Sequence, residues 1–366
     1  MTTRTGHLGG AAGAGARGRR TVGRDDPVRE RSGAVDRAAG EHRTPTAVPH
    51  PGSGHPASPR VRHGAAVVDG EAELLAAAVS FLEEGLRAGD LVALASPPET
   101  AELARAELGE RVPVDPALSL LGARAPDVLA RVRRSAEEAA AGRGGRLRIL
   151  SQVDLGPYPA GWREGLRLES AANRFLGDAA VDVLCVYDRQ RLPAEVVDHA
   201  ARTHPLLVRD GAWSVSPAFR DPAAYLRELP WPREPVEDTA PVLAVDDAPG
   251  LAALRHALGA VLADRVPDRE QREDLLLAAA EVAANAFRHG ERPVSARIWT
   301  DGRRVVCAIT DSGHTFADPL AGFQPAHGAD LSRGGMGLWL ARKLWDSVDL
   351  FPGPAGLTVR LSSRLR

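Results

Sequence analysis

Short and long hydrophobic runs alternate along residues 59–226. Short, almost continuous apolar runs, typical of buried strands, are separated by longer runs in which apolar residues recur every three or four positions, as in amphipathic helices. The strand-like runs cover residues 65–68, 91–95, 147–150 and 181–187. The helical runs cover residues 71–87, 99–108, 127–141 and 194–202. Such alternation predicts an α/β domain with a mainly parallel sheet covered by helices.

A second pattern follows in the last third of the chain. A long helical run at 275–289 precedes a strand-like run at 305–310, and another helical run covers 340–344. An earlier helical run at 251–258 is interpreted as the first helix of this second domain.

The segments around these two domains have no such periodicity. Residues 1–58 are rich in Gly, Ala, Arg, Pro and His and contain few large apolar residues, so we expect a disordered tail. A Pro-rich, acidic stretch at 229–238 is interpreted as a semi-stiff spacer. The predicted organisation is a tail (1–58), an α/β domain (59–226), a linker (227–245) and a second domain (246–366).

Composition narrows the function classes. The formal net charge is −2, so no overall field favours nucleic acid or a membrane surface. No apolar segment approaches the roughly 18 residues needed to span a bilayer, and no signal-peptide pattern stands at the N-terminus. Cys185 and Cys307 fall within apolar strand-like runs, where buried free thiols are expected. We therefore expect a cytoplasmic protein without direct contact to nucleic acid or membrane.

Three polar residues share one face of the helix predicted at 275–289. Glu281, Asn285 and His289 are spaced four apart, so each steps round the helix by only about 40°. Their neighbours are apolar, and polar side chains are costly to bury without partners. The stripe therefore indicates either a cleft with a polar ligand or a solvated helix face.

Two glycine-containing turns follow this helix. The strand-like run at 305–310 leads into Asp311, and Gly313 permits a tight turn and close approach of a ligand. A carboxylate at the end of this strand is suited to accept a hydrogen bond from the edge of a nucleotide base. Gly335 and Gly337 come directly before the next helical run, where backbone N–H groups at a helix N-terminus suit phosphate.

These features, in this order, resemble the ATPase superfamily of gyrase, heat-shock chaperones and histidine kinases, known as the Bergerat fold. Glu-x-x-x-Asn-Ala-x-x-His-Gly at 281–290 and Gly-Met-Gly-Leu-Trp-Leu at 335–340 look most similar to the anti-sigma-factor serine/threonine kinases of bacteria. The resemblance covers roughly residues 245–366 and implies an α/β sandwich that binds ATP and Mg²⁺.

The resemblance also implies roles for single residues. Asn285 matches the residue that coordinates magnesium, Asp311 matches the acceptor for the adenine amino group, and Glu281 matches the base toward a hydroxyl. The further residues implied to bind nucleotide are His289, Gly313, Gly335, Gly337, Leu338 and Thr358. We expect the segment 314–333 to order over ATP, and its expected pivots are Gly322, Pro325, Gly328 and Gly334.

Short blocks in the first domain resemble the MEDS sensory domain found ahead of ATPase modules in actinobacterial regulators. They lie, in order, at 62–65, 85–89, 169–173, 185–188 and 203–205. After the first strand, residues 69–73 offer acids and a single glycine in place of a phosphate loop, so we expect no nucleotide hydrolysis in this domain.

The candidate input residues of this domain are His63, Glu169, Asn173, Asp188 and His204. Asp188 closes a strand, where open α/β sheets bind ligands. A structural role stays open for both histidines: a turn or cap for His204, and a hydrogen-bonded buried imidazole for His63. No close metal-ligand spacing such as H-x-x-x-H occurs among these residues, so spacing gives a metal site little support.

Three function classes remain open. The preferred class is a serine/threonine kinase that phosphorylates a STAS-like anti-sigma antagonist, sequesters an alternative sigma factor and responds to an unknown small molecule. The second is a nucleotide-dependent sigma-factor binding switch without phosphate transfer. The third, a sensor histidine kinase, needs a dimerisation hairpin with a phosphoacceptor histidine, whereas His256 lies on a single helical run. A homodimer is also considered.

Overall fold

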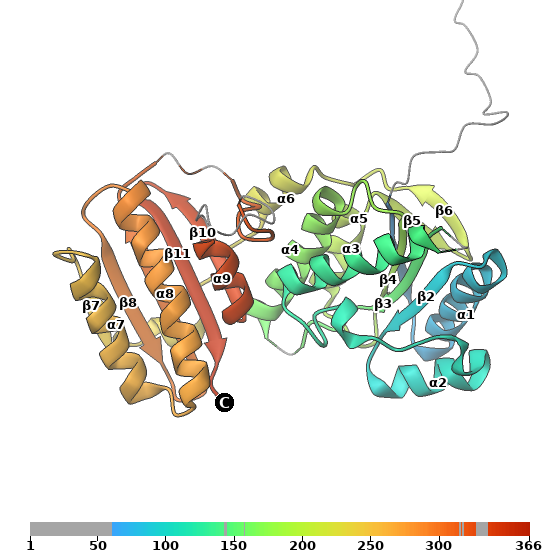
Figure 1. Ribbon diagram of the computed structural model, residues 1–366, viewed down its shortest axis with the longest axis horizontal. Helices are drawn as coiled ribbons and strands as arrows, with labels where there is room; N and C mark the ends of the chain where they lie inside the picture. Colours follow the sequence, from blue (N-terminus) through green and yellow to red (C-terminus); the bar gives the residue numbers. More distant parts are fainter. Residues whose placement is uncertain (1–60, 143–144, 157, 315, 317, 327–335) are drawn as a thin grey trace, which may run out of the picture. The chain divides into compact units, whose positions relative to one another are not determined.

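The computed structural model describes residues 61–142, 145–156, 158–314, 316, 318–326 and 336–366 (Figure 1). The tail predicted at 1–58 lies outside these ranges, as do Gly328, Gly334 and Gly335.

The N-terminal domain is an α/β domain built on one sheet. Its strands are β1 (Arg62–Val68), β2 (Leu91–Ala95), β3 (Leu147–Gln152), β4 (Val181–Asp188), β5 (Leu206–Arg209) and β6 (Ala212–Val215). Their order in the sheet is β2-β3-β4-β1-β5-β6. Neighbouring strands run parallel from β2 to β5, and the β5–β6 hairpin is antiparallel. The predicted mainly parallel sheet is confirmed.

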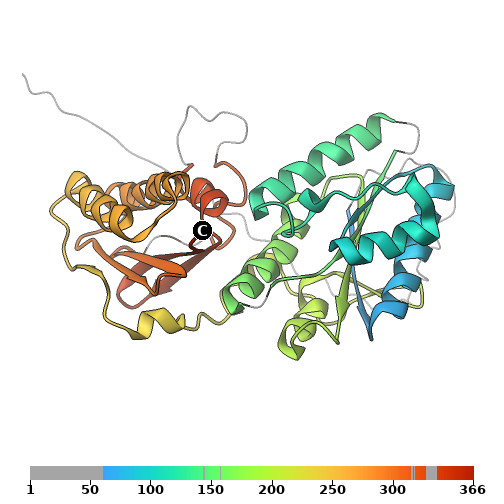
Figure 2. The same ribbon diagram turned by 90° about the horizontal axis from the view of Figure 1, so that it is seen from below.

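Helices cover both faces of this sheet (Figures 1 and 2). The helices are α1 (Glu71–Ala88), α2 (Pro98–Leu108), α3 (Ala125–Ala141), α4 (Pro159–Phe175), α5 (Ala194–Thr203) and α6 (Pro222–Glu228), with 3₁₀ turns at Gly109–Arg111 and Pro116–Leu118. Apolar side chains of α1 and α2 form one core with the sheet, and those of α3 and α4 form another. The two cores fix the sheet between helical layers.

Helix α4 was not predicted from the hydrophobic pattern. The side chains of Arg163, Glu164 and Arg167 are buried in this helix, where apolar residues would normally mark the inner face. These charged residues occupy inner positions of the helix and so interrupt the apolar periodicity. Their charges are neutralised by ion-pair partners and not by solvent. The short strands β5 and β6 were missed as well, since only half-buried or exposed residues form them.

The C-terminal domain is an antiparallel sheet with helices on one face (Figure 2). Its strands are β7 (Leu243–Val245), β8 (Ser295–Thr300), β9 (Arg304–Asp311), β10 (Ser347–Gly353) and β11 (Gly356–Arg364), in the order β10-β11-β9-β8-β7. Its helices are α7 (Leu251–Arg265), α8 (Arg269–His289) and α9 (Gly337–Leu344). Alternate residues of β8, β9 and β11 pack against α7, α8 and α9 in one core, so the predicted α/β sandwich is confirmed.

The segment interpreted as a spacer is docked on the sheet of the C-terminal domain. A 3₁₀ turn (Pro235–Asp238) places Glu237 in contact with Arg360 at 2.8 Å, and the Glu234 carboxylate accepts a 3.0 Å hydrogen bond from Ser362. Both glutamates are buried. Acidic residues of the segment interpreted as a semi-stiff spacer therefore hold it in place.

Buried charges connect helix α4 with the C-terminal sheet. Asp349 in β10 is fully buried and accepts hydrogen bonds from Arg360 at 2.6 Å and from Arg163 and Arg167 of α4. Glu164 of α4 accepts from Arg342 of α9 at 3.3 Å. One buried carboxylate pairs here with several guanidinium groups. Loss of any partner would leave a buried charge unpaired, which is costly.

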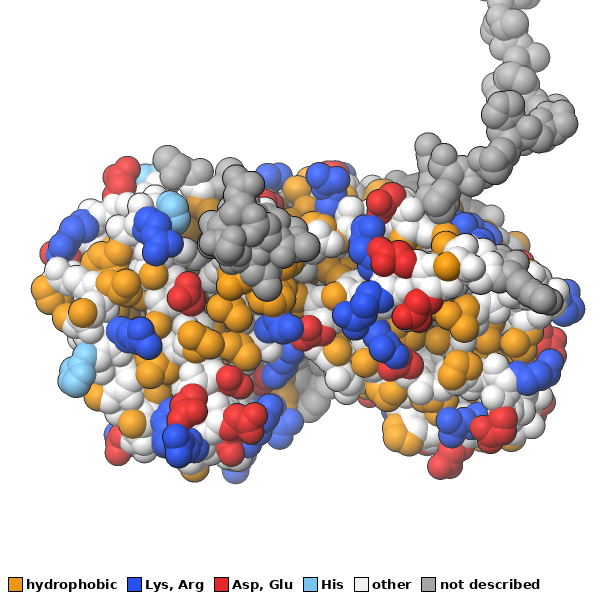
Figure 3. All heavy atoms as spheres, in the orientation of Figure 1, with side chains coloured by type: hydrophobic (Ala, Val, Ile, Leu, Met, Phe, Trp, Pro, Cys, Tyr) orange, Lys and Arg blue, Asp and Glu red, His pale blue; other side chains and the backbone are white. Residues whose placement is uncertain are grey.

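Charged side chains of both signs are interspersed on the face shown in Figure 3. That distribution agrees with the formal net charge of −2. In the described part of the chain, none of the helices is long and apolar enough to cross a bilayer.

Candidate functional site

A cavity of about 300 Å³ lies between α8 and the sheet of the C-terminal domain. It is lined by Val282, Asn285, Ala286, His289, Gly290, Ile309, Asp311, Gly313, Phe316, Leu338, Leu357 and Val359. Most walls are apolar, and the polar groups are few. This combination is typical of a site for a small planar ligand that is oriented by specific hydrogen bonds.

Asp311 is the buried polar group of this cavity. Its Oδ1 accepts hydrogen bonds from the backbone N–H of Gly313 at 2.8 Å and, more weakly, of Glu291 at 3.4 Å. Among the described residues, Oδ2 has no hydrogen-bond partner. The carboxylate is therefore held by one oxygen and can accept an N–H donor from a ligand with the other.

Glycine is required beside this carboxylate. A Cβ on Gly290, the residue after α8, would lie 2.3 Å from Cγ of Asp311, and one on Gly313 would lie 2.8 Å from its Oδ1. Side chains cannot approach so closely. Gly290 was not selected from the sequence as a site residue, although its place directly after the motif histidine is the signal that marks it.

Helix α9 begins next to the polar stripe of α8. A Cβ on Gly337 would lie 2.7 Å from Nδ2 of Asn285 and 3.3 Å from Cβ of Glu281. Within the described part of the chain no side chain caps the N-terminus of α9, so its first backbone N–H groups are available to an anion. Asn285 and a helix N-terminus therefore lie together, as a phosphate and its metal ion would require.

The structure does not bring every predicted nucleotide residue to the cavity. Asn285, His289, Asp311, Gly313 and Leu338 line it, and Gly337 lies against Asn285. Glu281 is half-buried one turn earlier on α8 and is not part of the lining.

Thr358 lies away from the cavity. Its hydroxyl bonds that of Thr310 at 2.8 Å, whereas its strand neighbours Leu357 and Val359 line the cavity. Successive side chains of a strand point to opposite faces, which places Thr358 on the other side of the sheet.

Apolar residues form most of the cavity wall and were not selected from the sequence. Ile309 in β9 precedes Asp311 by two positions, so both side chains lie on the same face. Phe316 follows the strand and adds an aromatic ring. The signal that would have found Ile309 is strand alternation counted back from the motif aspartate.

The segment predicted to order over a nucleotide is partly anchored. Gly322 has φ of +86°, and a Cβ there would lie 2.6 Å from the carbonyl oxygen of Leu338 in α9. Phe323 is fully buried. Gly322 is thus a close-packed turn and not the free pivot that was predicted, because the chain at this point is pressed against α9.

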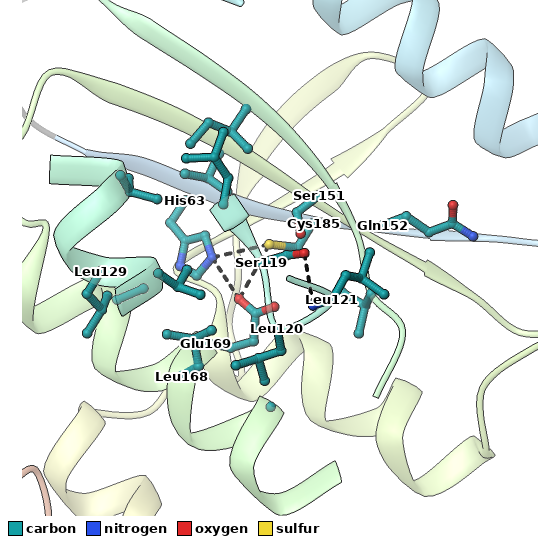
Figure 4. Close-up of a pocket in the computed structure, with 18 of the residues that line it drawn as sticks. His63, Ser119, Leu120, Leu121, Leu129, Ser151, Gln152, Leu168, Glu169 and Cys185 are labelled. Carbon is teal, nitrogen blue, oxygen red and sulfur yellow. Dashed lines mark hydrogen bonds and ion pairs between the residues drawn. The ribbon is translucent and has the colours of Figure 1, made fainter. Parts of the chain in front are cut away.

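The N-terminal domain contains a second cavity, of about 60 Å³, on the face of its sheet covered by α3 and α4 (Figure 4). Its walls are mainly leucine and valine side chains, and His63, Glu169 and Cys185 form a polar corner. A volume of this size is about that of two water molecules.

The polar corner brings several predicted input residues together. His63 Nε2 lies 3.1 Å from Oε2 of Glu169, and His63 Nδ1 lies 3.0 Å from Oδ1 of Asn173. His204 Nε2 lies 3.3 Å from the same glutamate oxygen. Cys185, interpreted from sequence only as a buried thiol, is a member of this group, with Sγ 3.4 Å from Glu169 Oε2.

Asp188 has a different environment from the other candidates. Its Oδ1 accepts from the backbone N–H of Gly70 at 3.1 Å and of Gln190 at 2.9 Å. These bonds stabilise the turns that follow β1 and β4. The structure therefore gives Asp188 a turn-stabilising position outside the second cavity.

Burial and mutual contact shift the ionisation of the polar corner. Burial alone would raise the pKa of Glu169, but contacts with His204 and His63 hold that pKa well below its usual range. Burial, then the charge of Glu169, raises the pKa of the Cys185 thiol well above its ordinary value. Burial, then the neighbouring His63, lowers the pKa of His204. Glu169 is thus ionised within this cluster.

Comparison with known families assigns both domains. Residues 62–205 match the family model of MEDS, the methanogen/methylotroph, DcmR sensory domain. Residues 245–363 match the model of the histidine kinase-like ATPase domain. No curated protein matches the chain. The chain therefore combines a MEDS sensory domain with a histidine kinase-like ATPase domain, as a signalling regulator does.

Proposed function

We propose that the C-terminal domain binds Mg–ATP and transfers the γ-phosphate to a serine or threonine of a STAS-like anti-sigma antagonist, under control of the sensory domain. In the same proposal, the protein sequesters an alternative sigma factor when the antagonist is phosphorylated. The observation that carries the proposal is the α8 cavity, in which a backbone-anchored carboxylate faces apolar walls beside Asn285 and the start of α9.

Three polar side chains in and beside this cavity have distinct roles in the proposal. The free oxygen of Asp311 accepts from the adenine amino group, and the apolar walls contact the base. Asn285 binds the magnesium ion, and the first turn of α9 receives the phosphates. Glu281, one turn from Asn285, acts as base when an acceptor hydroxyl enters.

The acceptor comes from another protein. No serine or threonine occurs among the described residues that line the cavity. A hydroxyl must be held in line with the phosphate to react, so a partner has to supply it. Transfer to a partner's hydroxyl distinguishes the proposal from a simple ATPase, in which water is the acceptor.

Contacts of the segment near α9 support control by the sensory domain. Leu320 and Phe323 are buried in a cluster with apolar residues of α3 and α4, and the rings of Phe323 and Phe175 lie 6.3 Å apart. Arg342 of α9 donates to the carbonyl of Ala321 at 3.0 Å. A shift in the position of α4 would therefore displace the segment that leads to the nucleotide site.

Replacing Asp311 with asparagine should weaken ATP binding. One acceptor oxygen becomes an N–H donor that opposes the adenine amino group, which costs about 1–3 kcal/mol, or about 5- to 150-fold in Kd. Isothermal titration calorimetry with Mg–ATP measures this change. Asp264→Asn, at an exposed position of α7, is the matched control. Equal ATP affinity in wild type and Asp311→Asn would contradict the role of Asp311.

The proposed function is tested with a purified STAS-like antagonist and a purified alternative sigma factor. Full-length protein is mixed with radiolabelled ATP and a STAS-like antagonist, and binding of antagonist and sigma factor is compared in ATP and in ADP. We expect transfer to the antagonist and competition between the two partners. Nucleotide-dependent binding without transfer would favour a switch, and label on the exposed His256 would favour a histidine kinase. Binding to neither partner would overturn the proposal.

A further inference from the structure

Ligand-type atoms of four side chains converge inside the sensory domain. One atom each from His63, Glu169, Cys185 and His204 lies within 4.8 Å of the others. The measured separations are 3.1 Å from His63 Nε2 to Glu169 Oε2, 3.5 Å from His63 Nε2 to Cys185 Sγ, 3.4 Å from Cys185 Sγ to Glu169 Oε2, and 3.3 Å from His204 Nε2 to Glu169 Oε2. Ligands about 2.1 Å from a tetrahedral metal ion lie about 3.4 Å apart.

The protonation of His63 is set by Asn173. The side-chain NH₂ of Asn173 donates to the backbone carbonyls of Thr203 at 2.7 Å, Glu169 at 3.1 Å and Ser170 at 3.3 Å. Its oxygen therefore faces Nδ1 of His63, which must carry the proton. In the neutral imidazole, Nε2 then presents a lone pair to the other three side chains.

His204 is oriented in the same way. Its Nδ1 lies 2.9 Å from the carbonyl oxygen of Ala200, which can only accept, so Nδ1 is the donor. The side chain is completely buried, and Nε2 makes no hydrogen bond although Glu169 Oε2 is 3.3 Å away. A second imidazole nitrogen without a hydrogen-bond partner thus lies beside Glu169 and within 4.8 Å of the other ligand atoms.

Lone pairs of two imidazoles and a carboxylate that converge in a buried space repel each other unless a proton or a metal cation lies between them. The thiol of Cys185 can supply one proton but not a positive charge. We propose that His63, Glu169, Cys185 and His204 form a binding site for one divalent transition-metal ion of the zinc type. Two nitrogens, one sulfur and one oxygen suit such an ion of intermediate softness, and a hydrogen bond on Nδ1 of each histidine is the usual support for a metal bound at Nε2. Binding releases the thiol proton to solvent, so that the thiolate is the ligand.

The four ligands come from separate parts of the domain. His63 is in β1, Glu169 in α4, Cys185 in β4, and His204 directly follows α5. A bound ion therefore ties two strands to the helices that cover them. Three of these residues also form the polar corner of the small cavity, so the ion would lie in its wall (Figure 4).

Cobalt(II) is the probe for this site. Full-length protein is freed of metal with a chelator and titrated with Co²⁺ while the absorption spectrum is recorded. We expect one Co²⁺ per chain, with the intense bands of tetrahedral cobalt and a thiolate-to-cobalt charge-transfer band that Zn²⁺ removes. The chain has only two cysteines, so Cys185→Ala should abolish the charge-transfer band and Cys307→Ala, in the core of the other domain, should keep it.

Asn173→Ala provides a milder variant. It keeps all four ligands and removes the support of His63, so Co²⁺ affinity should fall about 10- to 100-fold with the charge-transfer band retained. Circular dichroism shows whether each variant is folded. Absence of Co²⁺ binding in folded wild-type protein, a spectrum without a thiolate band, or a band that persists in Cys185→Ala would each overturn the site.

Discussion

Replacing Glu281 with alanine is expected to slow phosphate transfer to the protein acceptor by about 10²- to 10⁴-fold, with Mg–ATP affinity close to wild type. Glu281 lies outside the lining of the nucleotide cavity, so its loss removes no contact with the base. Its Cβ lies against the position of Gly337, where α9 begins and the phosphates are expected. The side chain is thus placed to act on the acceptor hydroxyl and not on the bound nucleotide.

Two further variants make this result specific. Glu270→Ala changes an exposed glutamate near the start of the same helix and should leave transfer intact. Asn285→Ala should show the opposite pattern, with weak Mg–ATP binding, because it removes the proposed magnesium ligand. The measurements are single-turnover transfer and calorimetric ATP affinity. Full transfer by Glu281→Ala would leave the enzyme without its base and would favour the non-catalytic switch.

Replacing Asp349 with asparagine is expected to lower the free energy of unfolding by about 3–5 kcal/mol at neutral pH. Asp349 is fully buried and is the shared acceptor of Arg163, Arg167 and Arg360. The neutral amide leaves these guanidinium groups with uncompensated charge. Urea unfolding measures the loss, with Asp264→Asn on exposed α7 as a control that should stay within about 0.5 kcal/mol of wild type.

The same carboxylate makes stability depend on pH. Burial alone would raise the pKa of Asp349, but Arg167, Arg163 and Arg360 hold it well below the ordinary value. A folded-state pKa below the unfolded value of about 3.9 stabilises the protein above that pH, and the contribution is lost progressively as pH falls further. Wild-type stability should therefore fall below about pH 4 more steeply than that of Asp349→Asn. Equal stability of the two proteins at neutral pH would contradict the buried network.

Local periodicity predicted strands β1 to β4 and most of the helices, but of the five strands in the C-terminal sheet it predicted only β9. The alternation of strand and helix runs predicted the parallel sheet because its central strands are buried on both faces and read as continuous apolar runs. Helix α4 was not predicted because its inner face carries the charged residues Arg163, Glu164 and Arg167 in place of apolar ones. Ion pairs with other residues make their burial possible. Partners distant in sequence cannot be inferred from a local pattern.

The same limit applies to the sites. Helical spacing puts Asn285 and His289 on one face of α8, because four-residue steps are a local property, and both residues line the cavity. The group around Glu169 depends on long-range pairing: β1 and β4 are in parallel register, with His63 opposite Val183, two residues from Cys185 on the same face. Because the sequence pattern did not predict α4, it could not place Glu169 beside His63 and Cys185. The cluster also lacks the short ligand spacing that would mark a metal site in the sequence.

We propose above that the α8 cavity binds ATP through Asp311 and Asn285. Calorimetric titration of the full-length protein with ATP, with and without Mg²⁺, and with GTP tests it most directly. We predict binding of ATP that is strengthened by Mg²⁺ and much weaker binding of GTP, because guanine presents a carbonyl oxygen where adenine presents the amino group that Asp311 accepts. Absence of ATP binding, or equal affinity for ATP and GTP, would contradict the account.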